Sequence, residues 1–263
     1  LIYYGNKDIK LENHWYDPNL NDEFNAIMKV NFTSICATDI EEWQFGPNYI
    51  NPNDPPIVHG HEITGEIIEL GKNIKHLKLG DTVAVNNVIH CKKCFWCFNG
   101  QGGACQSMKV AGFALDGGLS EYMRWPSSHL IKISDGIPKK YGALIEPSTV
   151  ATHAIRKSGV KPGDNVAVVG CGTVGLLTVQ VLKASGAIVT AVDIRSESLE
   201  LAKTFGADYV YDSSKNDFVD YLLSITGGIG HDIVFETAGA QMAPKISIDI
   251  TRRGGKTILV GIY

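Results

Sequence analysis

The chain has 263 residues, of which 44% are hydrophobic and 20% are charged, and its net charge is −4. This length suits two globular domains, each with a core of its own. The weak negative charge argues against a nucleic-acid partner, and no apolar run approaches the roughly 18 residues that a membrane span requires. Because no signal peptide opens the sequence, we expect a cytoplasmic protein that keeps its thiols reduced.

Short β-like runs separated by glycine turns make up the first half of the chain. Turn sequences such as Leu-Gly-Asp at 79–81 and Asp-Gly-Gly at 116–118 punctuate these runs. The alternation predicts strands over 26–32, 62–70, 81–89 and 119–125. Many short strands of this kind indicate a β-barrel-like domain, which we place at residues 1–147.

Four of the six cysteines lie in one stretch of this half, with the spacing Cys-x2-Cys-x2-Cys-x7-Cys. Cysteines separated by two residues can wrap a tight turn around one tetrahedral ion, and a reducing compartment favours a metal over disulfides. A bacterial ferredoxin cluster would need a closer fourth cysteine followed by proline. We therefore predict a structural zinc in a lobe over about 88–108, with disulfides or free thiols as the alternative. Its predicted ligands are Cys91, Cys94, Cys97 and Cys105.

The second half changes to alternating strands and helices. Helices are predicted from about 174 to 185 and over 196–206, and a third carries Phe218 and Leu222 on one face with Ser213 or Ser214 as its cap. The apolar runs predict strands over 165–170, 187–193, 232–239 and 255–262. This alternation is typical of a doubly wound parallel sheet, which we place at residues 148–263.

A glycine-rich loop follows the first of these strands. Gly170, Gly172 and Gly175 form G-x-G-x-x-G between a predicted strand and a predicted helix, where backbone N–H groups can bind a pyrophosphate. Asp193 ends the next strand, where a carboxylate can bind a ribose 2′-hydroxyl and repel a 2′-phosphate, which favours NAD over NADP. Arg195 could partly accommodate that phosphate, and a glycine turn in another α/β fold is the alternative. The predicted cofactor-binding residues are Gly170, Gly172, Thr173, Val174, Gly175, Asp193 and Arg195.

Taken separately, Cys36, His61, Glu62 and Glu146 each have a simple structural explanation, and spacing alone cannot join residues so far apart. Several segments nevertheless resemble one family, the zinc-dependent medium-chain alcohol/polyol dehydrogenases, which include sorbitol, 2,3-butanediol and threonine dehydrogenases. The resemblance runs through nearly the whole chain and rests on CATD, GHEITGEI, LGDTVAV, the four-cysteine lobe, DGGLSEY, IEPSTVATHA, GCGTVG and DIVFETAGA. It implies a GroES-like β-barrel catalytic domain followed by a Rossmann-type doubly wound sheet.

The resemblance also implies a catalytic zinc. Cys36, His61 and a carboxylate would hold it, and the carboxylate is Glu62 or Glu146, with the second binding directly or through water. Plain alcohol dehydrogenases have a cysteine where Glu146 stands, so the chain is similar to the polyol and diol members. Three protein ligands leave one position open, where a substrate hydroxyl loses its proton more easily before hydride passes to the nicotinamide.

Two further residues take roles from the resemblance. Thr38 would pass the substrate proton outward, and Asp39 would fix the tautomer of His61. A capping hydroxyl and a local turn are the respective alternatives. The chain departs from the butanediol group at Ala37, usually glycine, and at Glu41, where a histidine is common, which puts the outer end of a histidine relay in doubt.

The remaining aromatic and histidine residues near these motifs are less informative. Aromatic residues after a metal ligand wall the substrate pocket or simply pack, and the candidates are Trp43, Phe45 and Tyr49. Three histidines lack matching metal partners and are interpreted as core or surface residues, namely His59, His90 and His153.

Together these features predict a zinc-dependent enzyme that interconverts a secondary alcohol, polyol or vicinal diol with its ketone using NAD. L-threonine 3-dehydrogenase is the alternative within the class. A non-catalytic zinc- and nucleotide-binding relative and a zinc-ribbon nucleic-acid module are the alternatives outside it. The family implies a homodimer or homotetramer, but the sequence stops at the fifth Rossmann-type strand, so we expect this chain to be monomeric and to bind NAD weakly.

Overall fold

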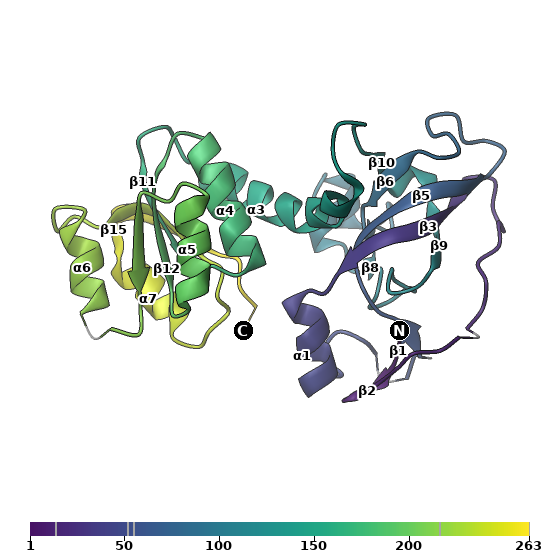
Figure 1. The fold of residues 1–263 in the computed structure, drawn as a ribbon, viewed down its shortest axis with the longest axis horizontal. Coiled ribbons are helices and arrows are strands. Elements are labelled where there is room, and N and C mark those ends of the chain that lie inside the picture. Colours follow the sequence, from purple (N-terminus) through teal and green to yellow (C-terminus); the bar gives the residue numbers. More distant parts are fainter. Residues whose placement is uncertain (14, 52, 55, 216, 263) are drawn as a thin grey trace. The chain divides into compact units, whose positions relative to one another are not determined.

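A computed structural model describes residues 1–13, 15–51, 53–54, 56–215 and 217–262. The chain divides into two compact units, Leu1–Glu146 and Pro147–Tyr263. The first is β-rich and the second alternates strands and helices (Figure 1).

The centre of the first unit is a five-stranded antiparallel sheet with the order β10-β6-β5-β3-β9. Its strands are β3 (Asn25–Ser34), β5 (Glu62–Leu70), β6 (Thr82–Val85), β9 (Tyr122–Pro126) and β10 (Leu130–Lys132). Met28, Ile63, Ile67 and Val83 from these strands are almost fully buried and form the core of this unit together with Trp125. Burial of such apolar side chains is the main favourable contribution to folding.

Smaller elements complete this unit. A three-stranded sheet joins β1 (Ile2–Gly5), β2 (Asp8–Lys10) and β4 (Ile57–Val58), and a hairpin pairs β7 (Val88–Ile89) with β8 (Lys109–Val110). The helices are α1 (Ala37–Phe45) and α2 (Phe95–Phe98), with 3-10 turns η1 (Gly102–Ala104), η2 (Ser127–His129) and η3 (Lys139–Leu144).

The second unit is built on a parallel five-stranded sheet with the order β13-β12-β11-β14-β15. Its strands are β11 (Asn165–Val169), β12 (Ile188–Asp193), β13 (Tyr209–Asp212), β14 (His231–Glu236) and β15 (Thr251–Leu259). The strand order reverses between β11 and β14. In sheets of this kind, nucleotides bind at the carboxyl ends of the strands at such a reversal.

Helices cover both faces of this sheet. They are α3 (Ile145–Ser158), α4 (Thr173–Ala184), α5 (Ser196–Thr204), α6 (Phe218–Ser224) and α7 (Ala243–Asp249). Along β11, Val168 packs with Leu182 of α4, whereas its neighbour Val169 packs with Leu222 of α6, as the period of two in a strand requires. None of the helices in the described part of the chain is long and apolar enough to cross a membrane.

Two predicted strands of the first unit have different bounds in the structure. The strand predicted over 81–89 is interrupted after Val85, because the Asn86 carbonyl accepts the Trp125 indole N–H (3.0 Å) instead of continuing the ladder. The strand predicted over 119–125 begins only at Tyr122, because the Leu119 N–H bonds to the carbonyl of His59 (2.9 Å).

The predicted serine cap of the third helix is wrong. Helix α6 begins at Phe218 with Asp217 as its N-cap. The backbone N–H and the hydroxyl of Ser214 both donate to Asp212 Oδ1, at 2.9 and 2.7 Å, which closes a turn at the end of β13. The last predicted strand is also shifted, because β15 starts at Thr251 and ends at Leu259.

Candidate functional site

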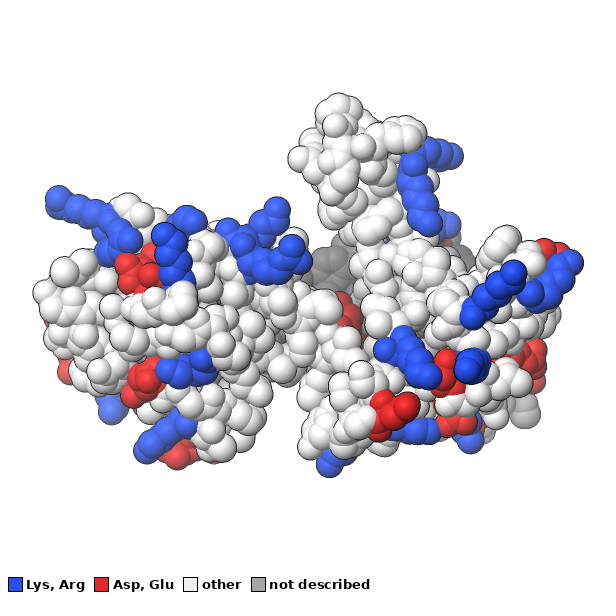
Figure 2. Space-filling model, turned by 90° about the horizontal axis from the view of Figure 1, so that it is seen from above, with Lys and Arg blue, Asp and Glu red and all other residues white. Residues whose placement is uncertain are grey.

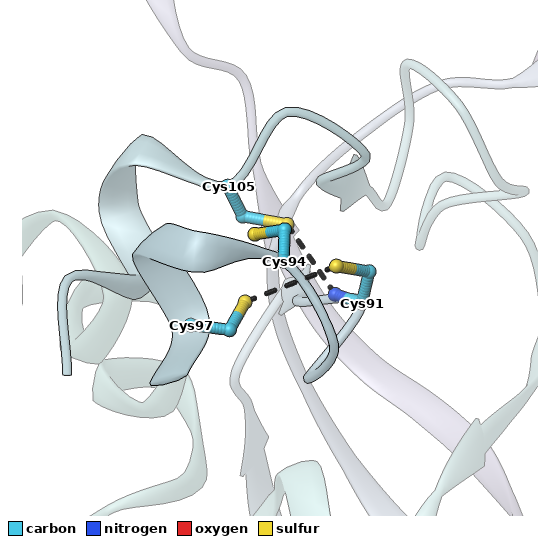
Figure 3. Close-up of side chains that lie close together, drawn as sticks. All are labelled: Cys91, Cys94, Cys97 and Cys105. Carbon is cyan, nitrogen blue, oxygen red and sulfur yellow. Dashed lines mark hydrogen bonds between the residues drawn. The ribbon is translucent and has the colours of Figure 1, made fainter. Parts of the chain in front are cut away.

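The four clustered cysteines converge on one point in the lobe. Their sulfur atoms all lie within 4.8 Å of one another, and Figure 3 shows the thiols gathered between α2 and the turn that precedes it. Lys92, in the turn between Cys91 and Cys94, adopts a left-handed backbone conformation with φ of 58°. Cys94 is the N-cap of α2, so this short helix places Cys97 on the same side as Cys91.

The spacing of these sulfur atoms fits a tetrahedral ion, and none of the four cysteines forms a disulfide. Cys91 Sγ lies 3.9 Å from Cys97 Sγ, whereas an S–S bond is about 2.05 Å long. Four thiolates at about 2.3 Å from zinc would stand about 3.8 Å apart. The Cys91 N–H donates to Cys105 Sγ (3.4 Å), and the Cys97 backbone N–H lowers the pKa of Cys94 to about 6. These contacts favour thiolates at Cys94 and Cys105, as a metal requires, whereas burial and the neighbouring cysteines raise the pKa of Cys97.

A second group of donors lies where β3 ends and β5 begins, beside the start of α1. Ser34 and Glu62 are paired in the β3–β5 ladder, and the Ser34 hydroxyl donates to the Glu62 carboxylate. Two residues beyond Ser34, Cys36 is the N-cap of α1. The donor atoms of Cys36, His61 and Glu62 all lie within 4.8 Å of one another. Strand pairing therefore joins residues that are far apart in the sequence.

Asp39 connects the start of α1 to this group. Its Oδ2 accepts the Cys36 N–H (3.0 Å), and its Oδ1 lies 3.3 Å from Nδ1 of His61. Burial raises the pKa of Asp39, but His59, His61 and the Cys36 N–H outweigh it and hold the pKa well below its usual range. The carboxylate is therefore ionised, and it directs the other ring nitrogen, Nε2, away from itself.

The donor group attracts positive charge. Burial lowers the pKa of His61, but Asp39 and Cys36 outweigh burial and raise it to about 10. One sulfur, one imidazole nitrogen and one carboxylate oxygen are also the ligand types that zinc accepts in catalytic sites with an open position. The Thr38 hydroxyl lies 3.5 Å from Cys36 Sγ, at the same end of α1. These residues fit a zinc ion, as the sequence predicts.

Glu146 lies beside this group but is not a member of it. The residue belongs to the first turn of α3, and its Oε1 accepts a hydrogen bond from Asn87 Nδ2 (3.1 Å). Asn87 also donates to the carbonyl of His61 (3.3 Å). Burial and the nearby Glu62 raise the pKa of Glu146, while His61 opposes them. The structure thus puts Glu62 with the other two donors and Glu146 next to them.

An aromatic side chain that the sequence did not single out packs on the predicted ligand. The Phe113 ring lies 5.2 Å from the His61 ring and 5.7 Å from the ring of Tyr49. The Tyr49 hydroxyl donates to Glu41 Oε2 (3.3 Å), while Trp43 and Phe45 are exposed on α1. No pattern around Phe113 in the sequence marks this contact.

A buried carboxylate holds the segment that carries Tyr49. Glu42 is fully buried, and its two oxygens accept the backbone N–H groups of Asn48 (3.2 and 3.0 Å), Tyr49 (2.8 Å) and Ile50 (3.4 Å). A buried polar group is tolerated when it is hydrogen-bonded in this way. The segment 48–50 is therefore fixed to α1, the helix that begins at Cys36.

The glycine loop of the second unit joins β11 to α4. Gly170 has a φ of +97°, and a Cβ at Gly175 would lie 1.9 Å from the Gly170 carbonyl oxygen, so only glycine fits there. A Cβ at Gly172, the N-cap of α4, would meet nothing closer than Arg195 Nη2 at 4.0 Å. The N-terminus of α4, formed by Thr173 and Val174, therefore begins beside open space, into which a pyrophosphate fits.

Asp193 and Arg195 lie next to this loop. Asp193 Oδ2 accepts the Cys171 N–H (2.6 Å), and Oδ1 accepts the backbone N–H (2.8 Å) and Nε (3.2 Å) of Arg195. Burial raises the pKa of Asp193, but these partners lower it below its ordinary value. The structure brings both predicted residues to the glycine loop, with the guanidinium bound to the carboxylate.

Three remaining histidines have different surroundings. His90 lies in the lobe against Gly102, and His153 is exposed on α3. His59 is buried in the core and contacts Asp39, a contact that the sequence did not predict.

Family models match both units of the chain. Residues 22–135 match an alcohol dehydrogenase GroES-like domain, and residues 173–263 match a zinc-binding dehydrogenase. The predicted order of a GroES-like domain followed by a Rossmann-type sheet is therefore confirmed.

Curated relatives are similar over most of the chain. L-Galactonate-5-dehydrogenase from Escherichia coli is 36% identical over 90% of this chain and 69% of its own length. (R,R)-Butanediol dehydrogenase from Bacillus subtilis is 34% identical over 99% of this chain and 76% of its own length. L-Threonine 3-dehydrogenase from Pyrococcus horikoshii is 36% identical over 90% of this chain and 68% of its own length.

Solved structures have the same fold. The crystal structure of 2R,3R-butanediol dehydrogenase from Bacillus subtilis has a TM-score of 0.89 at 34% identity, over 99% of this chain and 76% of that one. A chain from Sinorhizobium meliloti 1021, whose crystal structure contains NADP, has a TM-score of 0.88 at 28% identity, over 94% of this chain and 71% of that one.

Proposed function

Because this chain belongs to the zinc-dependent medium-chain alcohol and polyol dehydrogenases, we propose that it oxidises a secondary alcohol, polyol or vicinal diol to a ketone. It is an oxidoreductase that uses zinc and a nicotinamide dinucleotide. The names of three relatives refer to carbon 5 of galactonate, a stereocentre of butanediol and carbon 3 of threonine. Each of these carbons carries a secondary hydroxyl group, which supports a secondary alcohol as the substrate class.

One observation carries this proposal, namely the convergence of Cys36, His61 and Glu62 within 4.8 Å. These three residues would hold the catalytic zinc, with Glu146 as a nearby carboxylate that binds directly or through water. When bound, zinc supplies a Lewis acid that makes a substrate hydroxyl easier to deprotonate, and the dinucleotide supplies a hydride acceptor.

The residues around the ligands would orient the donors and move the proton. Asp39 Oδ1 lies 3.3 Å from His61 Nδ1 and would hold that nitrogen toward itself, which leaves Nε2 as the nitrogen that would face the metal. Thr38 is within 3.5 Å of Cys36 Sγ, which supports it as the hydroxyl that takes the substrate proton outward. Glu41 stands where the outer end of a relay would use histidine.

We propose that the four cysteines of the lobe hold a structural zinc, because all four positions are thiols and none is left for substrate.

We propose NAD rather than NADP as the preferred cofactor. The support is the ionised Asp193 beside the glycine loop, because a 2′-phosphate would face that carboxylate. None of the six cysteines forms a disulfide, which supports a reducing, cytoplasmic location. The oligomeric state, a dimer or tetramer in the family and a monomer for this chain, stays a prediction.

The proposal is tested first by elemental analysis of zinc in the purified protein. We expect two zinc ions per chain, one of which is lost in Cys36→Ser. A single zinc ion per wild-type chain would contradict the proposal of a catalytic zinc site, and only the dehydrogenase-like fold would then be supported.

The second test is a panel of vicinal diols, sugar alcohols and threonine, assayed with NAD and with NADP. We expect reduction of NAD with a diol or polyol. Activity with threonine alone would favour the threonine dehydrogenase alternative, to which the 36% identity to the Pyrococcus enzyme gives support. Binding of zinc and NAD without turnover of any of these would favour a non-catalytic relative.

A further inference from the structure

His59 is buried beside the predicted metal site without belonging to its ligands. The residue is 1% exposed, and its Nδ1 lies 3.3 Å from Oδ1 of Asp39. Nδ1 of His61 lies 3.3 Å from the same oxygen. One carboxylate oxygen therefore lies between two imidazoles, which come from a single His-Gly-His sequence.

The backbone around His59 is firmly held. The Leu119 N–H donates to the carbonyl of His59 (2.9 Å), and the Gly118 N–H donates to the carbonyl of Gly60 (2.9 Å). Gly60 has a φ of +92°, and a Cβ there would lie 2.8 Å from the Leu119 side chain. These contacts fix the turn that carries both imidazoles. The position of His59 beside Asp39 therefore follows from the backbone conformation.

Ring packing restricts the imidazole further. The ring of His59 lies 4.9 Å from the ring of Tyr3 and 5.8 Å from that of Phe113. Phe113 also packs on His61. The two imidazoles thus share one aromatic neighbour and one carboxylate oxygen.

The chemistry of the carboxylate decides what each imidazole does there. A carboxylate oxygen accepts hydrogen bonds, so an imidazole beside it is best placed to offer an N–H. Here both Nδ1 atoms lie 3.3 Å from Asp39 Oδ1 as close contacts without hydrogen-bond geometry. For His61 this leaves Nε2 for a metal. His59 places a second ring nitrogen 3.3 Å from the same oxygen of Asp39, a residue that is 4% exposed and has little access to bulk water.

We propose that His59 is a positioning residue, which holds the Asp39 carboxylate in the orientation that directs Nε2 of His61 toward the catalytic metal. This inference rests on the proposed function, because it presumes metal binding by Cys36, His61 and Glu62. Asp39 without His59 would keep the Cys36 N–H on one oxygen but would lose one of two contacts on the other.

Two substitutions separate the N–H of His59 from its bulk. His59→Leu keeps much of the volume and removes the donor, whereas His59→Asn keeps an N–H close to the position of Nδ1. Alanine is unsuitable because a cavity of about 160 Å³ already borders His59 and Asp39. His231→Leu is the matched control, because His231 is equally buried, at 1% exposed, but lies in the second unit.

The readouts are zinc affinity in chelator competition and the d–d absorption of the cobalt-substituted protein, both on the full chain. Cys36→Ser, which lacks a proposed ligand of the catalytic metal, gives the cobalt absorption of the cysteine cluster alone. We expect His59→Leu to bind the catalytic metal about tenfold more weakly, at the low end for groups that orient metal ligands, and to shift the cobalt bands. His59→Asn should restore both, and His231→Leu should change neither.

Wild-type affinity and an unchanged cobalt spectrum in His59→Leu would overturn the inference and leave the proposed function intact. The inference would also fail if His59→Asn bound the catalytic metal as weakly as His59→Leu does, because the effect would then come from packing. A wild-type protein that binds metal only at the cysteine cluster would overturn both the inference and the proposed function.

Discussion

Glu62 and Glu146 approach the predicted catalytic metal from different elements, β5 and α3. Only Glu62 belongs to the donor group within 4.8 Å, whereas Glu146 Oε1 accepts from Asn87. We expect Glu62→Gln to lower the affinity for the catalytic metal by about 10-fold or more, and Glu146→Gln to lower it less. Zinc retained per chain after dialysis against a chelator measures this. Loss of zinc from Glu146→Gln alone would assign the direct ligand to Glu146 instead.

Asp193 gives a second prediction for a single residue. Asp193→Ser removes the carboxylate that is proposed to bind the ribose 2′-hydroxyl and repel a 2′-phosphate. A hydrogen bond to a charged group contributes about 1.5–3 kcal/mol, so we expect NAD affinity to fall by about 10-fold or more while NADP affinity rises. Titration calorimetry with both dinucleotides measures the change. Arg195→Ala is the control, which should keep the preference for NAD.

The glycine loop between β11 and α4 can be tested with two matched substitutions. A Cβ at Gly175 would overlap the Gly170 carbonyl, whereas a Cβ at Gly172 would enter open space. We expect Gly175→Ala to lower the free energy of unfolding of the second unit by about 1–3 kcal/mol. Gly172→Ala should leave stability nearly unchanged and weaken NAD binding. Denaturant titration and calorimetry separate these effects, and equal destabilisation by both would contradict the structure.

His231 makes the stability of β14 depend on pH. Its ring is buried near the carbonyl of Ile250 and the hydroxyl of Thr190, and burial lowers its pKa below the ordinary 6.5. Below pH 6.5 the unfolded chain therefore binds a proton that the folded unit does not. The free energy of unfolding should fall as the pH drops from 6.5 toward the lowered pKa, by at most about 1.4 kcal/mol per pH unit.

The measurement is urea unfolding of the wild-type protein and His231→Leu between pH 7.5 and pH 5. The variant should lack this part of the pH dependence. Hydrogen bonds and basic neighbours lower the pKa values of Asp193, Asp208 and Asp232 in the same unit, so their contribution is lost only at more acidic pH. An identical slope in both proteins would show that His231 is not responsible.

Elements with a strong local pattern could be predicted from the sequence, whereas the 14-residue helix α3 and several short elements were missed. Strand β5 matches its predicted bounds, because nine residues of strong β-forming pattern precede a glycine turn. Helix α1 was missed because Ile40, Trp43 and Phe45 are exposed and give no apolar stripe. Strand β13 was missed because it is a four-residue edge strand that is only partly buried.

The parts of the candidate site that depend on local sequence could be predicted, and those that depend on strand pairing could not. Local spacing marked the cysteine cluster and the glycine loop, and both are compact in the structure. Cys36 and Glu62 meet only through the pairing of β3 with β5, which no local pattern encodes, so resemblance alone joined them. Asn87 and Phe113 reach the site from an interrupted strand and a loop, and their role depends on tertiary packing.

At the scale of the whole molecule, each unit has its own buried core. Figure 2 shows basic and acidic side chains interspersed over both units on the face in view. Ion pairs such as Lys132–Asp81 in the first unit and Lys183–Asp208 in the second are partly exposed, so each contributes little to stability. The stability of each unit therefore depends mainly on its core and, in the first, on the lobe.

Loss of the metal in the cysteine lobe should act on the first unit. Cys97→Ser removes one of four thiols, and structural zinc sites contribute directly to folding. We expect the amides of β7 and β8, which flank the lobe, to lose protection from hydrogen exchange, while those of β11 and β12 keep theirs. Mass-spectrometric hydrogen exchange measures both. Equal loss of protection in β11 would show that the lobe stabilises the whole chain.

Glu42 has a consequence for how this protein can acquire new specificities. Its carboxylate binds segment 48–50 through backbone N–H groups, which every residue except proline provides. The side chains of Asn48 and Tyr49 are exposed and take no part in that anchoring. Mutational libraries at these two positions can therefore vary the surface beside Phe113 while the backbone of the segment stays bound to Glu42.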